Sequence, residues 1–122
     1  MFDNENKPKG IKRIYLASLN STRAFKWLLK NESAFRQELL LFVLCIPLTF
    51  YFDVSPFERT MLILSIVFIM FTEVINTAIE AVVDRISLDI HPLSGLAKDL
   101  GSAAVLISIV IASCIWTVIL FS

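Results

Sequence analysis

Long apolar runs separated by short polar segments dominate the chain after its first thirty residues. Three stretches carry little charge and are long enough to cross a bilayer, at about residues 39–52, 60–83 and 101–121. Polar residues flank each run and extend the helical pattern on both sides. The pattern therefore predicts transmembrane helices at 33–52, 56–84 and 99–121.

The residues before the first apolar run show a different pattern. Residues 1–10 hold Asn, Lys, Pro and Gly, which is typical of a disordered lead. Residues 11–31 alternate with a helical period between an apolar side and a basic side, so we expect an amphipathic helix on the membrane surface. Asn20 and Ser21 could cap a second segment, which leaves two short helices with a hinge as an alternative. The apolar side holds Ile11, Ile14, Ser18, Phe25, Leu28 and Leu29, and the basic side holds Lys12, Arg23, Lys26 and Lys30.

Composition and charge support a membrane protein with one domain over residues 1–122. The chain is 57% hydrophobic, which is high for a soluble domain, and its formal net charge of zero does not indicate a nucleic-acid partner. Of the eleven Lys and Arg residues, only Arg59 lies between the first and second predicted spans. The positive-inside rule then places the N-terminus in the cytoplasm and the C-terminus in the periplasm. The sequence "HPLSG" between the second and third spans predicts a turn.

A stripe of polar residues is the strongest functional signal. Glu73, Asn76, Glu80 and Asp84 are spaced by 3, 4 and 4 residues. A helix places such residues within about 80° of arc and about 16 Å of length. An acid at the centre of a membrane helix costs roughly 2.5–3.5 kcal/mol on insertion scales, so such acids usually face a protein interior or a cavity. We expect the stripe to form one wall of a polar site that opens to the cytoplasm.

Further polar residues stand at the same predicted depth. Carboxylates with a lysine suit Mg²⁺ and phosphate chemistry, because Mg²⁺ takes one or two carboxylates together with phosphate oxygens and water. The three glycines of the chain form no nucleotide-binding loop of a known type. A structural interpretation, with charged ends that only reach the interface, stays open. The residues alone therefore indicate a polar site at a lipid interface and name no substrate. The flanking residues are Glu32, Arg13, Lys98 and Asp99.

Three blocks, "NESAFRQE", "EVINTAIEAVVDRI" and "LSGLAKDLGSAAVLI", resemble the signature blocks of the prokaryotic diacylglycerol kinase family. The resemblance runs from about Arg13 to Trp116. It implies an all-α homotrimer whose subunits have three transmembrane helices and an N-terminal surface helix, with active sites shared between neighbours. It also implies Mg²⁺- and ATP-dependent phosphorylation of diacylglycerol to phosphatidate in the inner membrane of Gram-negative bacteria.

The resemblance also assigns roles to single residues. Glu73 matches the proton acceptor, with Asn76 and Lys98 as further catalytic residues, and Glu32 and Glu80 match the metal ligands. Asn20 stands where the family usually has tyrosine. The residues matched to nucleotide contacts are Arg13, Asn20, Glu32, Glu80, Asp89, His91, Lys98 and Asp99. Those matched to lipid contacts are Ser18, Arg36, Glu73, Ser102 and Trp116.

Two alternative functions stay open at this point. An undecaprenol kinase would share the same catalytic blocks and differ only in its lipid acceptor. A subunit for ion translocation or assembly, from another functional class, would use Glu73 or Glu80 as a proton carrier and would need neither ATP nor Lys98.

Overall fold

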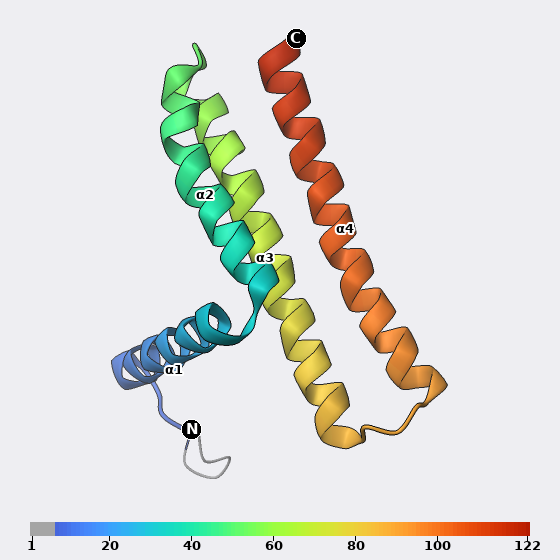
Figure 1. The fold of residues 1–122 in the computed structure, drawn as a ribbon. Coiled ribbons are helices and arrows are strands. Elements are labelled where there is room, and N and C mark those ends of the chain that lie inside the picture. Colours follow the sequence, from blue (N-terminus) through green and yellow to red (C-terminus); the bar gives the residue numbers. More distant parts are fainter. Residues whose placement is uncertain (1–6) are drawn as a thin grey trace. The chain divides into compact units, whose positions relative to one another are not determined.

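The computed structural model describes residues 7–122, which contain helices and no strand. The helices are α1 (Ile11–Asn31), α2 (Ser33–Tyr51), α3 (Pro56–Ile86) and α4 (Pro92–Phe121), as Figure 1 shows. By length and composition, α2, α3 and α4 are able to cross a membrane. This confirms the prediction of an all-helical membrane protein. Most of the predicted lead, residues 1–6, lies outside the described residues.

The chain divides into two compact units, residues 1–36 and 37–122, and the division falls within α2. In the first unit, α1 is one continuous helix over the predicted residues 11–31, so the alternative of two short helices with a hinge at Asn20 and Ser21 is excluded. The side chain of Asn20 does not cap a new helix, because it accepts a hydrogen bond from Arg23 one turn later. Ser18 Oγ donates to the Ile14 carbonyl at 2.9 Å. These side-chain hydrogen bonds lie within one continuous helix, which shows no break at Asn20 and Ser21.

The second unit begins its longest helix with a strong local signal. Ser55 caps α3, because its hydroxyl accepts from the Glu58 N–H at 3.1 Å and the Glu58 carboxylate accepts from the Ser55 N–H at 2.9 Å. Pro56 occupies the first turn, where its missing N–H costs nothing. Arg59 Nε donates to the Thr49 carbonyl at 3.2 Å, which ties the end of α2 to the start of α3.

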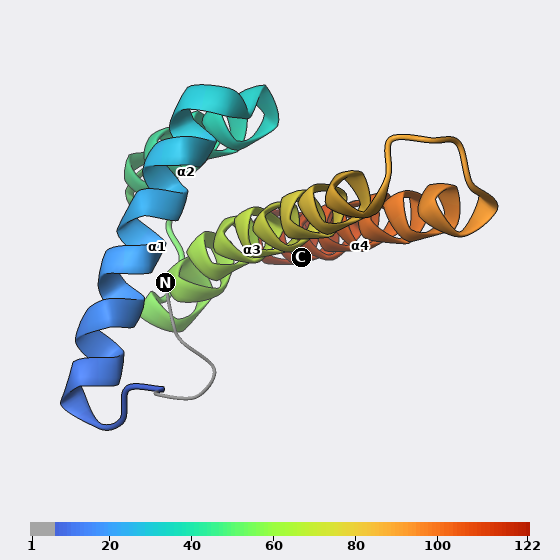
Figure 2. The same cartoon turned by 90° about the horizontal axis from the view of Figure 1, so that it is seen from below.

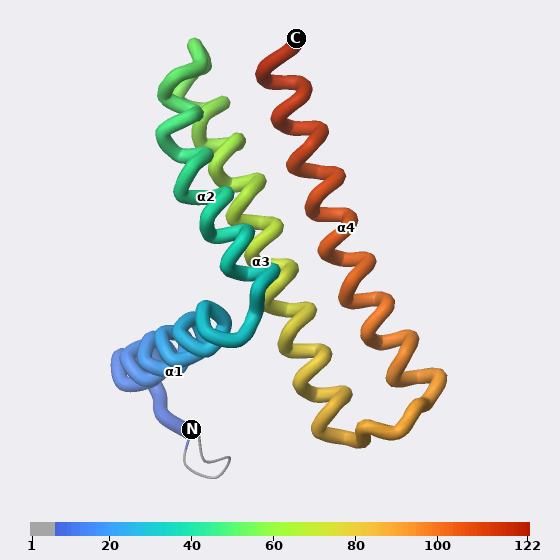
Figure 3. The backbone as a smooth tube through the Cα atoms, viewed as in Figure 1, coloured from blue at the N-terminus to red at the C-terminus, as the bar shows by residue number. Residues whose placement is uncertain are grey.

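The start of α4 differs from the prediction. The helix begins at Pro92, whereas the sequence pattern predicts a span from residue 99 and a turn at "HPLSG". His91 Nδ1 accepts a hydrogen bond from the Leu93 N–H at 3.1 Å, so His91 is the N-cap. Because proline suits the first helical position, the histidine and proline start a helix here. Figure 3 shows the short loop that remains between α3 and α4.

Within the second unit, α3 and α4 lie side by side and antiparallel (Figures 1 and 2). A small apolar cluster joins all three helices of this unit, and Leu62 of α3 is fully buried. Many large apolar side chains point outward instead, as in helices that face hydrocarbon. The cluster contains Cys45, Ile66, Ile69 and Ala112, with Phe42 and Trp116 packed against it.

Candidate functional site

Gly101 of α4 lies directly against the side chain of Asn76 of α3. A Cβ atom at position 101 would clash with the Asn76 side-chain oxygen and would lie 3.3 Å from its Cγ. Asn76 is only 7% exposed, and its Oδ1 has no hydrogen-bond partner within the part of the chain that the structure describes. Gly101 therefore leaves space for a buried amide whose oxygen is available to a further group.

The Asn76 amide also orients its neighbour on the stripe. Its Nδ2 donates to Glu80 Oε1 at 3.3 Å, one turn along α3. Glu73 lies one turn in the other direction and is 8% exposed. The stripe thus changes from buried at Glu73 and Asn76 to half-buried at Glu80 and exposed at Asp84. Glu73 and Asn76 therefore lie in the protein interior, whereas Glu80 and Asp84 lie toward the loop between α3 and α4.

At the loop end, Lys98 of α4 pairs with Asp84 of α3. Their Nζ and Oδ1 atoms lie 2.9 Å apart, and both side chains are about half exposed, at 45% and 48%. The Lys98 ammonium also interacts electrostatically with the Glu80 carboxylate. Asp99, the next residue of α4, is exposed. The structure therefore brings Lys98 to the stripe, as the sequence predicted, and adds Asp84 as its partner.

Sequence reasoning missed Glu38, which lies on α2 within the same unit. Its charge interacts with that of Glu73, and its Oε2 is buried with no hydrogen-bond partner among the described residues. Glu38 lines a cavity of about 450 Å³ whose other walls are mostly apolar side chains of α2, α3 and α4. A carboxylate inside the predicted span 33–52 was the available signal, because insertion scales penalise such a residue.

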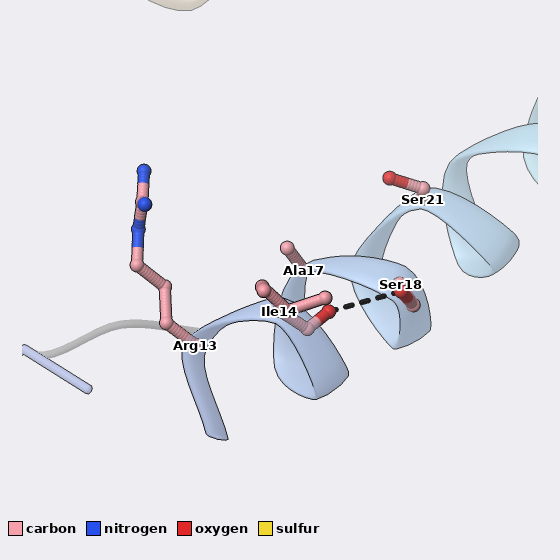
Figure 4. A pocket seen from close by; sticks show the side chains of 5 residues that line it. All are labelled: Arg13, Ile14, Ala17, Ser18 and Ser21. Carbon is pink, nitrogen blue, oxygen red and sulfur yellow. Dashed lines mark hydrogen bonds between the residues drawn. The ribbon is translucent and has the colours of Figure 1, made fainter. Parts of the chain in front are cut away.

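The predicted residues of the first unit occupy α1 and the start of α2. Arg13 and Ser18 line an open groove of about 530 Å³ along α1, where Figure 4 shows the arginine side chain extending from the helix. Glu32 ends α1, and its N–H donates to the Leu28 carbonyl at 2.9 Å. Arg36 donates to the Leu29 and Lys30 carbonyls at 3.0 and 3.2 Å and so satisfies the C-terminus of α1.

Because Glu32 and Glu80 belong to different units, their shared metal site stays a prediction. The described part of the chain contains no group of three or more His, Cys, Asp and Glu residues that could hold a metal ion. Mg²⁺ does not require such a group, since one or two carboxylates with phosphate oxygens and water complete its coordination. The half-buried Glu80 carboxylate, oriented by Asn76, therefore fits a Mg²⁺ ion that arrives with a nucleotide.

The remaining predicted residues have local structural roles, and their contacts with ligands stay predictions. The Asp89 N–H donates to Ser87 Oγ at 3.0 Å in the loop, and His91 caps α4. Ser102 is exposed beside Gly101. Trp116 Nε1 donates to Ser65 Oγ at 2.9 Å, so the indole ring is anchored inside the helical unit.

Comparisons with known proteins identify the family of the chain. The profile described as prokaryotic diacylglycerol kinase matches residues 19–120. The chain is 44% identical to the diacylglycerol kinase of Escherichia coli strain K12, over 96% of both chains. It is 44% identical to that of Pseudomonas aeruginosa over 91% of this chain and 90% of the relative, and 41% identical to that of Haemophilus influenzae over 94% and 98%. With a buried acid and amide on a membrane helix at the centre of the matched region, the chain belongs to the prokaryotic diacylglycerol kinase family.

Proposed function

We propose that the protein transfers the γ-phosphoryl group of Mg-ATP to the free hydroxyl of diacylglycerol and releases phosphatidate and ADP. One observation carries this proposal beyond family membership. Glu73 is a carboxylate that is 8% exposed on a membrane-spanning helix, one turn from the Asn76 amide that Gly101 accommodates. A buried acid at lipid depth suits a substrate whose reacting hydroxyl never leaves the membrane.

Glu73 serves as the general base in this reaction. The diacylglycerol oxygen attacks the γ-phosphorus, the bond from that phosphorus to the β,γ-bridging oxygen breaks, and the hydroxyl proton passes to the Glu73 carboxylate. Asn76 positions the reacting groups through its buried amide, whose oxygen is unpartnered among the described residues. General-base catalysis of this kind contributes about 10²–10⁴ in rate.

The loop end of the site receives the nucleotide. Lys98 carries a positive charge beside Glu80 and Asp84, where it offsets phosphate charge once ATP displaces its carboxylate partner. Glu80, together with Glu32, holds the Mg²⁺ ion. When bound, the ion neutralises charge on the phosphate oxygens and helps to align the phosphoryl group. Arg13, Asn20, Asp89, His91 and Asp99 complete the proposed nucleotide contacts, while Ser18, Arg36, Ser102 and Trp116 complete the lipid contacts.

The protein works as a homotrimer in the bacterial inner membrane, with the N-terminus in the cytoplasm and the C-terminus in the periplasm. The exposure of the stripe supports assembly, because three helices leave Asp84 exposed and Glu80 only half-buried. A neighbouring subunit that covers this face completes the site. The distribution of Lys and Arg supports the orientation, which places the loop end of α3 and α4 at the cytoplasmic surface.

The decisive experiment is a kinase assay with purified protein in mixed micelles. Labelled Mg-ATP is supplied with diacylglycerol, with undecaprenol, or with neither lipid. We expect labelled phosphatidate, and no transfer in the absence of lipid or of Mg²⁺. Transfer to undecaprenol alone would make the protein an undecaprenol kinase, and no transfer to either lipid would exclude a lipid kinase.

A further inference from the structure

Polar or close contacts join α3 to α4 at four heights along their length. The partners follow antiparallel order, because the residue numbers on α3 rise as those on α4 fall. Two of the contacts belong to the proposed site, and two lie in the apolar part of the helices. The four contacts are Ser65 with Trp116, Thr72 with Ser108, Asn76 with Gly101, and Asp84 with Lys98.

The contact between Thr72 and Ser108 joins two buried hydroxyl groups in the apolar part of the helix pair. Thr72 Oγ1 and Ser108 Oγ lie 2.9 Å apart, and the residues are 7% and 0% exposed. Each hydroxyl also lies close to a carbonyl of its own helix, Thr72 to Ile69 at 2.8 Å and Ser108 to Val105 at 2.6 Å. One hydroxyl therefore donates across the helix pair while the other donates to its own helix. Both hydroxyl groups therefore have hydrogen-bond partners when α3 and α4 lie in this register.

The contact between Ser65 and Trp116 forms a second link with a defined direction. Trp116 Nε1–H donates to Ser65 Oγ at 2.9 Å, and Ser65 Oγ–H donates to the Leu62 carbonyl at 2.6 Å. An indole N–H is a donor only, so it needs an acceptor when it is removed from water. A shift of α4 along α3 would deprive Trp116 of this acceptor.

The proposed site tolerates little movement between the two helices. Asn76 fits against α4 because residue 101 has no Cβ. A slide of one helical turn, about 5.4 Å, would bring Ala97 or Val105 toward the amide instead, and each of these residues carries a Cβ. Thr72 lies one turn before Asn76 on α3, and Ser108 lies about 10 Å from Gly101 along α4. The hydroxyl pair is thus the nearest directional contact to the site within the apolar part of the pair.

We propose that Thr72 and Ser108 are positioning residues for phosphoryl transfer, supported by Ser65 and Trp116. Their hydrogen bonds fix the register of α4 on α3, and this register holds Asn76 against Gly101 and Lys98 opposite Asp84. The inference rests on the proposed kinase function. None of these four residues needs to touch the phosphoryl group to have this effect.

The proposed positioning role of Thr72 and Ser108 differs from an ordinary contribution to stability. Apolar side chains of α3 and α4 attract each other through dispersion, which has little directional preference and tolerates neighbouring registers. Hydrogen bonds between membrane helices add little to stability on average, yet their geometry is directional. Loss of the hydroxyl pair should therefore disturb turnover more than it disturbs folding.

The test compares two substitutions at one position. Thr72→Val keeps the shape of the side chain and removes its hydroxyl, whereas Thr72→Ser keeps the hydroxyl. We expect Thr72→Val to lower kcat about three- to tenfold, with the KM for ATP and the melting temperature little changed. Thr72→Ser should restore most of the rate. Ser108→Ala should resemble Thr72→Val, and the double variant should lose little more than either single variant.

Thr60→Val is the matched control on the same helix. Thr60 is exposed, and its hydroxyl donates only to the Pro56 carbonyl of its own helix, at 2.9 Å. This variant should keep the wild-type rate. If Thr72→Val behaves like Thr60→Val, the positioning role is wrong. If Thr72→Val and Thr72→Ser both lose rate in proportion to lost heat stability, Thr72 only packs and the inference is equally wrong.

A second measurement does not depend on kinase activity. Spin labels at the exposed positions Phe71 and Ile107, in a cysteine-free background and diluted with unlabelled subunits, report the distance between α3 and α4. Thr72→Val should broaden this distance distribution, and Thr72→Ser should leave it narrow. An unchanged distribution in Thr72→Val overturns the register role. If wild-type protein phosphorylates no lipid while Thr72→Val still shows the expected broadening, the proposed kinase function is refuted and the fixed register stands.

Discussion

The two halves of the α3–α4 pair differ in whether their buried polar atoms have hydrogen-bond partners. In the half far from the loop, the buried Ser65, Thr72 and Ser108 hydroxyls all have hydrogen-bond partners. In the half near the loop, Asn76 Oδ1 and Thr77 Oγ1 are buried and have no partner in the described part of the chain. Glu38 Oε2 of α2, whose carboxylate charge interacts with that of Glu73, is also buried and has no partner among the described residues.

The difference separates a stabilising half from a functional half. A buried polar atom without a partner costs about 1–3 kcal/mol, so a protein keeps such atoms where a ligand completes them. The far half, with its apolar cluster around Ile66, Ile69 and Ala112, supplies packing energy that offsets this cost. Substitutions of the unpartnered residues in the loop half should therefore change catalysis, while those in the apolar packing of the far half should change stability. The Thr72 and Ser108 hydroxyls of the far half affect catalysis only through the register of α4 on α3.

The largest effect on turnover is expected for Glu73→Gln. Glutamine keeps the shape of the side chain and removes its basicity, so kcat should fall about 10²–10⁴-fold while the dependence on Mg²⁺ and ATP changes little. Initial rates with diacylglycerol measure this, after gel filtration confirms the wild-type oligomer. Glu58→Gln, which alters a helix cap in the far half, is the control and should leave kcat unchanged. A Glu73→Gln enzyme with near wild-type activity would show that the buried acid is structural.

Gly101→Ala should follow, with a loss of turnover of about 10². The new methyl group would clash with the Asn76 amide and displace it from Glu80 and from the reacting groups. Gly95→Ala is a matched control on the same helix, because a Cβ there meets no atom within 4 Å. Steady-state kinetics of both variants test the contact. Equal activities would mean that the close approach at position 101 has no catalytic role.

Glu80→Gln should have a smaller and rescuable effect. Removal of one carboxylate charge should weaken the apparent affinity for Mg²⁺ and ATP by about tenfold, and excess Mg²⁺ should restore part of the rate. The measurement is the initial rate against Mg²⁺ concentration, beside the same titration of Glu73→Gln. Rescue of Glu73→Gln by Mg²⁺, without rescue of Glu80→Gln, would reverse the two assigned roles.

Leu62→Ala should have the smallest effect on turnover and a clear effect on stability. Leu62 is fully buried in the far half, so the cavity should cost about 2–5 kcal/mol of unfolding free energy. The KM for ATP should not change, and kcat should stay within about twofold of wild type at temperatures below unfolding. Thermal unfolding in micelles, with the exposed Leu64→Ala as control, measures the difference. A large loss of kcat in folded Leu62→Ala would show that packing in the far half also controls catalysis, and the distinction between the two halves would be wrong.

Local sequence patterns determined the helices and the polar stripe on α3, whereas the roles of most single residues came from the family resemblance and stay predictions. Apolar run length fixed three helices able to cross a membrane, and a helical period fixed the position of α1. The spacing of Glu73, Asn76 and Glu80 is enough by itself to place them on one face of a helix. These predictions succeeded because helix formation in lipid depends on neighbours in sequence, which satisfy every backbone hydrogen bond within the segment.

One local alternative was excluded and one local prediction failed, because weak signals compete within a few residues. Asn20 and Ser21 have the chemistry of a helix cap, but α1 continues through both residues. The Asn20 side chain accepts a hydrogen bond from Arg23 within the same helix instead of capping a new one. The "HPLSG" segment has the composition of a turn, but His91 as N-cap and Pro92 at the first helical position start α4 there. In both cases hydrogen-bond geometry, which composition does not encode, decided the outcome.

The sequence by itself determined which residues share a helix face, and only the tertiary structure decided which faces meet. Gly101 opposite Asn76 and Asp84 opposite Lys98 both depend on the register of α3 against α4. The position of Glu38 near Glu73 depends in the same way on how α2 packs. Apolar run length constrains no register, because lipid and protein surfaces are equally apolar. Steric fit at a missing Cβ and directional hydrogen bonds between distant residues set it instead.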